Sequence, residues 1–188
     1  MKKSYHYDDH TWPELKERVD DQPVVLLPVG SVEDHGHHLP LKTDNFFTTT
    51  LCERVAEEIP DEVLIMPLIP YGFNYHHSAD FPGTIHVEGQ PFIEYVLGVT
   101  KSVAYHGFEK ILIVDGHGSN MPFLDIVARR TVMETDAVCG AFIYMHLIKD
   151  LLAELRETEM KEGRMAHAGE FETSLYLYLD ESSVHKEK

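Results

Sequence analysis

Apolar and polar residues follow two periodicities along this chain. Four short, nearly unbroken apolar runs predict buried strands, and between them apolar residues recur three or four positions apart, which predicts helices. The predicted strands are residues 24–29, 63–68, 111–114 and 137–144, and the predicted helices are residues 13–19, 46–58, 90–107 and 121–134. Leu147, Leu151 and Leu155 mark a further helix. Residues 172–179 suit either a strand or a helix, because Leu and Tyr alternate there after a loop.

The order of these elements predicts the fold class. Strands that alternate with helices form parallel sheets covered by helices, so we expect an α/β fold, a three-layer sandwich with a mostly parallel central sheet. With 188 residues, of which 43% are hydrophobic, the chain suits a single domain over residues 1–188. Residues 71–84 are rich in turn-forming and aromatic residues and predict a long loop.

The net charge of the chain argues against two classes of binding partner. It has 16 Lys and Arg against 32 Asp and Glu, a formal net charge of -16, which would repel nucleic acid and anionic membranes. No apolar run is long enough to cross a bilayer, and the first residues have no apolar signal-peptide core, so we expect a cytoplasmic protein. Cys52 and Cys139 show no metal-binding or disulfide spacing and are expected to be reduced, buried and structural.

The first polar loop follows the strand at residues 24–29. Glu33, His35 and Asp44 lie within a dozen residues of one another, and their carboxylate oxygens and imidazole nitrogens suit a divalent metal. In an extended backbone Glu33 and His35 project to the same face, because side chains alternate. The alternative is a solvated loop in which Asp44 only caps the following helix.

A second polar loop follows the strand at residues 111–114. It reads DGHGSN over residues 115–120, and the glycines on either side leave His117 accessible to a partner. Ligands bind beyond the carboxyl ends of parallel strands, so we expect this loop to meet the first one.

A third polar segment, residues 165–174, lies at a loop-to-helix junction. It contains His167, Glu170 and Glu172. For Glu170 we favour capping of the helix start, where free N–H groups and the helix dipole attract a carboxylate. For His167 and Glu172 we favour a functional role, because of the following resemblance.

Taken together, these segments resemble the creatininase (creatinine amidohydrolase) family. The matching stretches keep the family's order from about residue 24 to 180. They are residues 28–44 (PVGSVEDHGHHLPLKTD), 71–72 (YG), 81–84 (FPGT), 115–120 (DGHGSN) and 167–174 (HAGEFETS). The resemblance implies an α/β fold, one or two divalent metal ions per chain, and hydrolysis of a non-peptide amide C–N bond, often in a ring. It also implies a small-molecule substrate and a homo-oligomer, commonly a hexamer.

The resemblance assigns roles to individual residues. Glu33, Asp44 and His117 would hold one metal, and His35 with Asp44 would hold the second, so that Asp44 bridges the two ions. His167 falls on the histidine that gives a proton to the leaving nitrogen. Zinc is the first expectation from the ligand types, and manganese or iron(II) suit so many oxygen ligands.

The chain also departs from the family pattern. Creatininase has a carboxylate ligand two positions after the loop histidine, where this chain has Ser119. We therefore expect Glu172 to complete the second metal site; the alternative is a single metal, with Glu172 hydrogen-bonded to its ligands. Creatininase encloses its substrate with tryptophans, but Trp12 here lies far from the motifs, so creatinine is not the expected substrate. We expect His38, His77 and Ser119 to contact the substrate.

Three functions remain open at this level. The first is metal-dependent hydrolysis of a small cyclic or linear amide. The second is hydrolytic opening of a cyclic ketone such as a keto-inositol, with C–C cleavage. The third is a non-catalytic metal-binding protein that keeps the scaffold. The chain is also shorter than expected for the family, which leaves open a missing C-terminal segment.

Overall fold

Four parallel strands form the central sheet in a computed structural model that describes residues 4–75, 80–159 and 167–188. The strands are β1 (Val24–Val29), β2 (Val63–Ile65), β3 (Lys110–Asp115) and β4 (Val138–Ile143), and their order in the sheet is β2-β1-β3-β4. Parallel strands need crossover connections, and a helix lies between each strand and the next along the chain.

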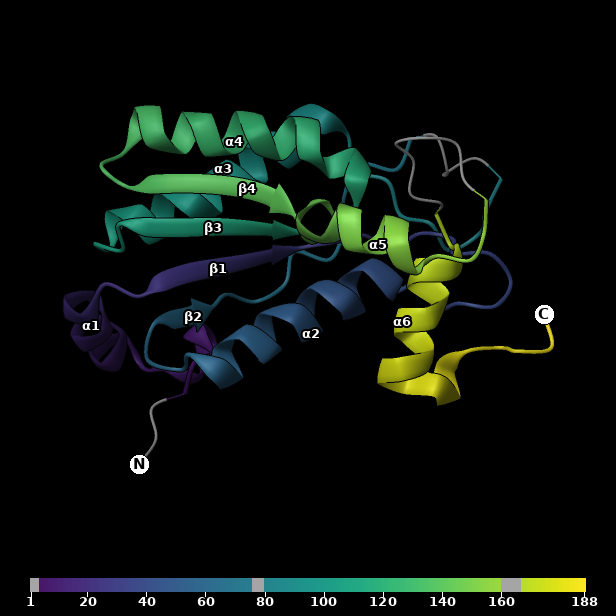
Figure 1. Cartoon of the computed structure of the whole chain (residues 1–188). Helices are drawn as coiled ribbons and strands as arrows, with labels where there is room; N and C mark the ends of the chain where they lie inside the picture. The colour runs from purple at the N-terminus through teal and green to yellow at the C-terminus, as the bar shows by residue number, and fades with distance from the viewer. Residues whose placement is uncertain (1–3, 76–79, 160–166) are drawn as a thin grey trace.

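Helices cover both faces of this sheet (Figure 1). Helices α3 (Gly89–Tyr105) and α4 (Met121–Glu134) lie on one face, and α2 (Thr43–Glu58) lies on the other. The other helices and 3-10 turns are α1 (Trp12–Asp21), α5 (Lys149–Leu155), α6 (Glu170–Asp180), η1 (Tyr7–Asp9), η2 (Gly118–Asn120), η3 (Tyr144–Ile148) and η4 (Glu181–Ser183). The predicted three-layer α/β sandwich is confirmed.

The unbroken apolar runs of the central strands follow from burial on both faces. In β1, Leu27 and Val29 pack against α3 and α4, whereas Leu26 packs on the opposite side with Cys52 of α2. Burial of each such side chain contributes roughly 1.5–3 kcal/mol, so the two layers of contacts hold the sheet between its helices.

The local predictions that differ from the structure do so for physical reasons. The bounds predicted for β1 and α4 are correct, but β2 ends at Ile65 rather than at residue 68, because Pro67 has no N–H for the ladder. Residues 170–180 form helix α6. Glu172 and Tyr176, four positions apart, are both buried while Tyr178 is 84% exposed, which is a helical pattern of burial.

The strands end level with one another at the carboxyl edge of the sheet. Val29 pairs with Asp115, and Asp115 pairs with Ile143. The loops after β1, β3 and β4 therefore leave the sheet side by side, and α5 and α6 lie at this edge, whereas α1 lies at the opposite end (Figure 1).

Two further sequence expectations concern cysteine and membranes. Both cysteines are unpaired; Cys52 is buried as expected, but Cys139, on the edge strand β4, is only half-buried. None of the helices within the described ranges is both long and apolar enough to cross a bilayer.

Candidate metal centre

The possible ligands of the first two polar loops come together at the carboxyl edge of the sheet. Glu33 and His35 follow β1, His117 follows β3, and Asp44 is the second residue of α2. All four are buried, with 5% exposure or less. Ionisable groups buried together in this way need compensating charge, either from one another or from a bound ion.

Two groups of possible ligands share Asp44. One is Glu33, Asp44 and His117, and the other is His35, Asp44 and Glu172. Nδ1 of His117 lies 2.9 Å from Glu33 Oε1 and 3.3 Å from Asp44 Oδ2. Nε2 of His35 lies 3.1 Å from Asp44 Oδ1 and 3.8 Å from Glu172 Oε2. The two oxygens of Asp44 thus face different imidazoles, as in a carboxylate that bridges two metal ions.

Backbone carbonyls determine which nitrogen of each imidazole faces these groups. Nε2–H of His117 donates to the carbonyl oxygen of Phe73 at 3.0 Å, and Nδ1–H of His35 donates to that of Glu33 at 3.3 Å. Metal-binding histidines usually donate their outer N–H in this way. The remaining nitrogen of each ring faces the carboxylates, where it could bind a cation together with them.

The charges of this centre fit a divalent cation. Glu33 Oε2 and Asp44 Oδ2 are buried and accept no hydrogen bond within the described part of the chain. Burial disfavours the charged form of His117, but close contacts with Asp44 and Glu33 outweigh it and raise its pKa to about 11. Burial likewise opposes charging of His35, whereas Asp44 and other carboxylates raise its pKa to about 9. The carboxylates therefore favour a positive charge at the nitrogen that faces them, and a metal ion would supply that charge in place of a proton.

Glu172 reaches the second group from helix α6. It is 6% exposed, and its Oε2 accepts the N–H of Ala168 at 2.6 Å, which orients the carboxylate. Burial raises the pKa of Glu172 to about 7, although the nearby His35 opposes this shift. A carboxylate that is costly to charge on its own is stabilised by an adjacent cation, so its burial favours a bound ion.

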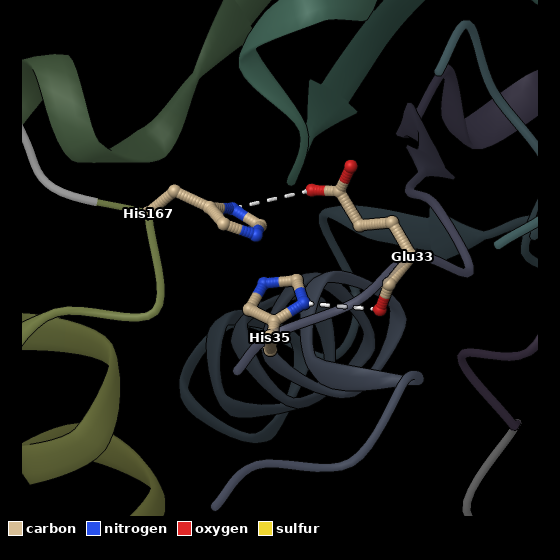
Figure 2. A group of neighbouring side chains, drawn as sticks. All are labelled: Glu33, His35 and His167. Atoms are coloured by element: carbon tan, nitrogen blue, oxygen red, sulfur yellow. Dashed lines mark hydrogen bonds and ion pairs between the residues drawn. The ribbon is translucent and has the colours of Figure 1, made fainter. Parts of the chain in front are cut away.

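His167 lies beside Glu33 and His35 (Figure 2). The ring centroids of His167 and His35 are 4.4 Å apart, and Nδ1 of His167 is 3.4 Å from Glu33 Oε1. Its Nε2–H donates to the carbonyl oxygen of Asp34 at 2.6 Å. The His167 side chain is 34% exposed, so it can meet an incoming molecule. Glu33, His35 and His167 also form a third group within metal-binding reach.

Two glycines let helix α2 approach the loops closely enough to place Asp44. A Cβ atom at Gly30 would come within 3.0 Å of Asn45. A Cβ atom at Gly116 would clash with Thr48 and would lie 2.7 Å from the backbone oxygen of Asp44. Residues 30 and 116 are therefore glycine because the start of the helix occupies the space of a side chain.

Gly116→Ala is expected to push α2 away from the loop after β3. Overpacking of this kind costs about 1–3 kcal/mol of unfolding free energy, which urea denaturation measures. The control is Gly98→Ala in α3, where an added Cβ meets nothing within 4 Å. That change should not destabilise the protein, because alanine is the better helix former. Equal stabilities of the two variants would contradict the close packing at Gly116.

A family model that matches nearly the whole chain identifies the family. Residues 8–188 match the family model described as creatininase, creatinine amidohydrolase. The chain belongs to the creatininase family.

Relatives within the creatininase family carry three different names. The creatinine amidohydrolase of Pseudomonas putida is 32% identical, over 95% of this chain and 73% of that protein. The 3-dehydro-scyllo-inosose hydrolase of Thermotoga maritima is 28% identical over 97% of this chain, which spans only 58% of that relative. The mycofactocin precursor peptide peptidase of Mycobacterium ulcerans is 30% identical, over 98% of this chain and 71% of that protein. All three names describe hydrolysis, but they describe different substrates.

Solved creatininases share the fold of this chain. A mutant creatininase of the Zn-Zn type matches with a TM-score of 0.84 and 30% identity, over 97% of this chain and 75% of that chain. A creatininase solved in a manganese form matches with a TM-score of 0.85 and 31% identity over the same shares. The likeness confirms the creatininase-like α/β fold.

The residues expected to contact substrate in this creatininase-family chain lie in different surroundings. Nε2 of His38 is 2.9 Å from Oγ1 of Thr173, so this histidine ties the first loop to α6. Ser119 is half-buried in η2 beside His117. His77 lies outside the described residues.

The sequence predicts that the Glu170 side chain caps the start of its own helix, but in the structure this side chain binds another segment. Glu170 is the first residue of α6, but its carboxylate accepts the backbone N–H groups of Glu157 and Thr158, both at 2.8 Å. It also accepts the Thr158 hydroxyl at 2.6 Å. The predicted position in the first turn, where the helix dipole favours a carboxylate, is confirmed. The N–H groups that this carboxylate binds belong instead to the segment after α5, whose position cannot be derived from local sequence.

Tyr144 is a neighbour of the centre that sequence reasoning missed. It directly follows β4 and is buried. Burial raises its pKa well above the ordinary value, and the charges of Glu172, Asp44 and Asp115 raise it further. The rule that ligands lie beyond the carboxyl ends of parallel strands, applied to β4 as well as to β1 and β3, would have found it.

Proposed function

We propose that this protein is a metal-dependent hydrolase that cleaves the C–N bond of a small cyclic or linear amide. The observation that carries the proposal is the position of Asp44, whose Oδ1 and Oδ2 lie 3.1 Å from His35 and 3.3 Å from His117. A carboxylate shared by two buried groups of ligands supports a site for two metal ions.

The proposed ligands divide evenly between the two ions. Glu33, Asp44 and His117 would hold one ion, and His35, Asp44 and Glu172 would hold the other. Such ions, when bound, activate water near neutral pH and polarise a substrate carbonyl. Three protein ligands for each ion leave positions open, as catalytic sites require. The mixture of oxygen and nitrogen favours zinc, with manganese or iron(II) compatible.

His167 is the proposed proton donor to the leaving nitrogen. It is the most exposed residue of the three groups, and its imidazole stands beside Glu33 and His35. The carbonyl of Asp34 holds its Nε2–H and so fixes the orientation of the ring. Nδ1, which lies 3.4 Å from Glu33 Oε1, is then the atom that would take a proton from the attacking water and pass it to the leaving nitrogen. A histidine held at the rim of a buried charged centre is well placed for acid catalysis.

The substrate is proposed to be a small molecule other than creatinine. Ser119 stands where creatininase has a carboxylate ligand, so the surroundings of the second ion, which Glu172 would complete here, differ from those in creatininase. Trp12 is 77% exposed on α1, at the end of the sheet away from the metal centre (Figure 1), so it cannot enclose a substrate there.

Opening of a cyclic ketone is the second candidate. The Thermotoga maritima relative, named as an inosose hydrolase, supports it. Attack of activated water on a carbonyl serves C–N and C–C cleavage alike, so the same residues suit both reactions. A non-catalytic metal-binding protein remains the alternative if no substrate is turned over.

A substrate panel tests the proposal. The protein, loaded separately with zinc, manganese or iron(II), is assayed with creatinine, other cyclic amides, linear formamides, a keto-inositol and a short peptide. We expect turnover of a cyclic or linear amide that requires metal and is lost with a chelator. Turnover of the keto-inositol alone would favour the second candidate. Stoichiometric metal without any turnover would favour the non-catalytic alternative, and protein that retains no metal would exclude all three proposals.

Glu172→Gln is expected to reduce the metal content from about two ions per chain to about one, because a neutral amide is a poor replacement for a carboxylate ligand. Elemental analysis after dialysis measures this change. The control is Glu181→Gln, which alters an exposed carboxylate paired with Lys186. Two ions retained by Glu172→Gln would mean that Glu172 supports the ligands without binding metal.

A further inference from the structure

A chain of hydrogen bonds runs from Asn120 through the backbone of Phe73 to His117. Asn120 Oδ1 accepts the N–H of Phe73 at 3.0 Å. The carbonyl oxygen of the same residue accepts Nε2–H of His117, also at 3.0 Å. Asn120 and His117 belong to the loop after β3, whereas Phe73 belongs to the long loop after β2. One residue of a distant loop is therefore held by two side chains of the DGHGSN segment.

The amide of Asn120 is itself fixed in one orientation. It is 0% exposed, and its Nδ2 donates to the carbonyl oxygen of Gly30 and to Oδ1 of Asp115, each at 3.1 Å. Both amide hydrogens and the oxygen are used, so a flipped amide would lose all three bonds. The end of β1, the end of β3 and Phe73 meet at this one side chain.

Gly72 shows how closely the distant loop approaches this amide. A Cβ atom at position 72 would come within 3.0 Å of the Asn120 side-chain amide. The backbone of Gly72 is not left-handed, so its conformation does not demand glycine. Glycine is required at position 72 because the Asn120 side-chain amide occupies the space of a Cβ atom.

Other contacts keep the distant loop in place without Asn120. The Phe73 ring lies 4.7 Å from that of Phe123 and 5.1 Å from that of His86, between ring centroids. The N–H of Asn74 donates to Nδ1 of His86 at 3.0 Å. Loss of the Asn120 side chain would therefore leave the loop docked but would free the Phe73 backbone to turn its carbonyl.

We propose that Asn120 is a positioning residue for His117, acting through the Phe73 carbonyl to keep Nδ1 of the imidazole aimed at Glu33 and Asp44. The inference rests on the proposed metal site and adds to it a residue that touches neither metal nor substrate. Without a fixed carbonyl, the imidazole can rotate or change tautomer, and it then presents the wrong nitrogen to the ion. Losing such a partner typically costs about 10- to 100-fold in metal affinity.

The test compares zinc affinity and ring geometry in three full-length proteins: wild type, Asn120→Ala and Asn74→Ala. Asn74 is the matched control, because it is as buried as Asn120 and lies next to Phe73 in the loop after β2, but its Nδ2 donates to Ser31 and Ile85. Chelator competition should show one zinc ion bound about 10- to 100-fold more weakly in Asn120→Ala. The ring ¹⁵N shifts of His117 in the zinc-loaded protein should change as well. Asn74→Ala should match the wild type in both measurements.

Two results would overturn the inference. One is wild-type affinity and ring shifts in Asn120→Ala; the other is an equal loss in Asn74→Ala, which would reduce Asn120 to a packing role. A wild-type protein that binds no zinc is a separate outcome, because it removes the proposed function on which the inference rests. If Asn120→Ala fails to fold, Gly72→Ala replaces it. This substitution keeps Asn120 but adds a methyl group that displaces its side-chain amide, so it should weaken zinc binding in the same way.

Discussion

Asp44→Asn is expected to empty both metal positions and to abolish turnover. Asp44 belongs to both groups of buried possible ligands, and each of its oxygens faces a different imidazole. Asparagine keeps the shape of the side chain but removes the negative charge that both ions would share. Loss of several kcal/mol of transition-state stabilisation corresponds to a decrease in kcat/KM on the order of 10³-fold or more.

Elemental analysis and kcat/KM measure the two effects separately. The control is Asp125→Asn, which neutralises an exposed aspartate that pairs with Arg129 on α4. That variant should keep its metal and its activity, because surface ion pairs contribute little. Two ions retained by Asp44→Asn would show that Asp44 is not the bridging ligand.

His117→Ala and His167→Ala are expected to fail in different ways. His117 is buried between Glu33 and Asp44, so its loss should remove metal from one position. His167 is partly exposed beside the group, so its loss should leave the metal in place while kcat falls about 10²- to 10⁴-fold, the usual contribution of acid–base catalysis.

Metal content decides between these roles, since both variants lose activity. The control is His37→Ala, which removes an exposed histidine from the first loop. The comparison is informative because the distances also allow His167 to bind metal, in a third group with Glu33 and His35. If His167→Ala lost an ion, its proposed role as proton donor would be wrong.

The elements of the fold could largely be predicted from sequence because burial leaves a local pattern. Strand β1 is buried on both faces and therefore reads as an unbroken apolar run. Helix α6 could not be decided, because Leu and Tyr alternate along it and either period fits. Only the neighbours of α6 show that Glu172 and Tyr176 share a buried face.

The candidate centre could be predicted from sequence as far as its side chains, but not the backbone groups that orient them. Glu33, His35 and Asp44 lie close in sequence, and the rule for parallel sheets brought in His117. The carbonyl of Phe73, which holds the imidazole of His117, carries no side-chain signature and comes from a loop of irregular sequence. Backbone groups that orient a ligand from far along the chain cannot be predicted from residue types.

Glu172 has a consequence for how the C-terminal helix is held. It is the possible ligand of the second group that α6 supplies, whereas His35 and Asp44 come from the loop after β1 and the start of α2. An ion in this position would work as a cross-link between α6 and the sheet, added to the packing of Tyr176 against α2 and the contact between His38 and Thr173. The first group, Glu33, Asp44 and His117, contains no residue of α6, so only an ion in the second group would add a contact to that helix.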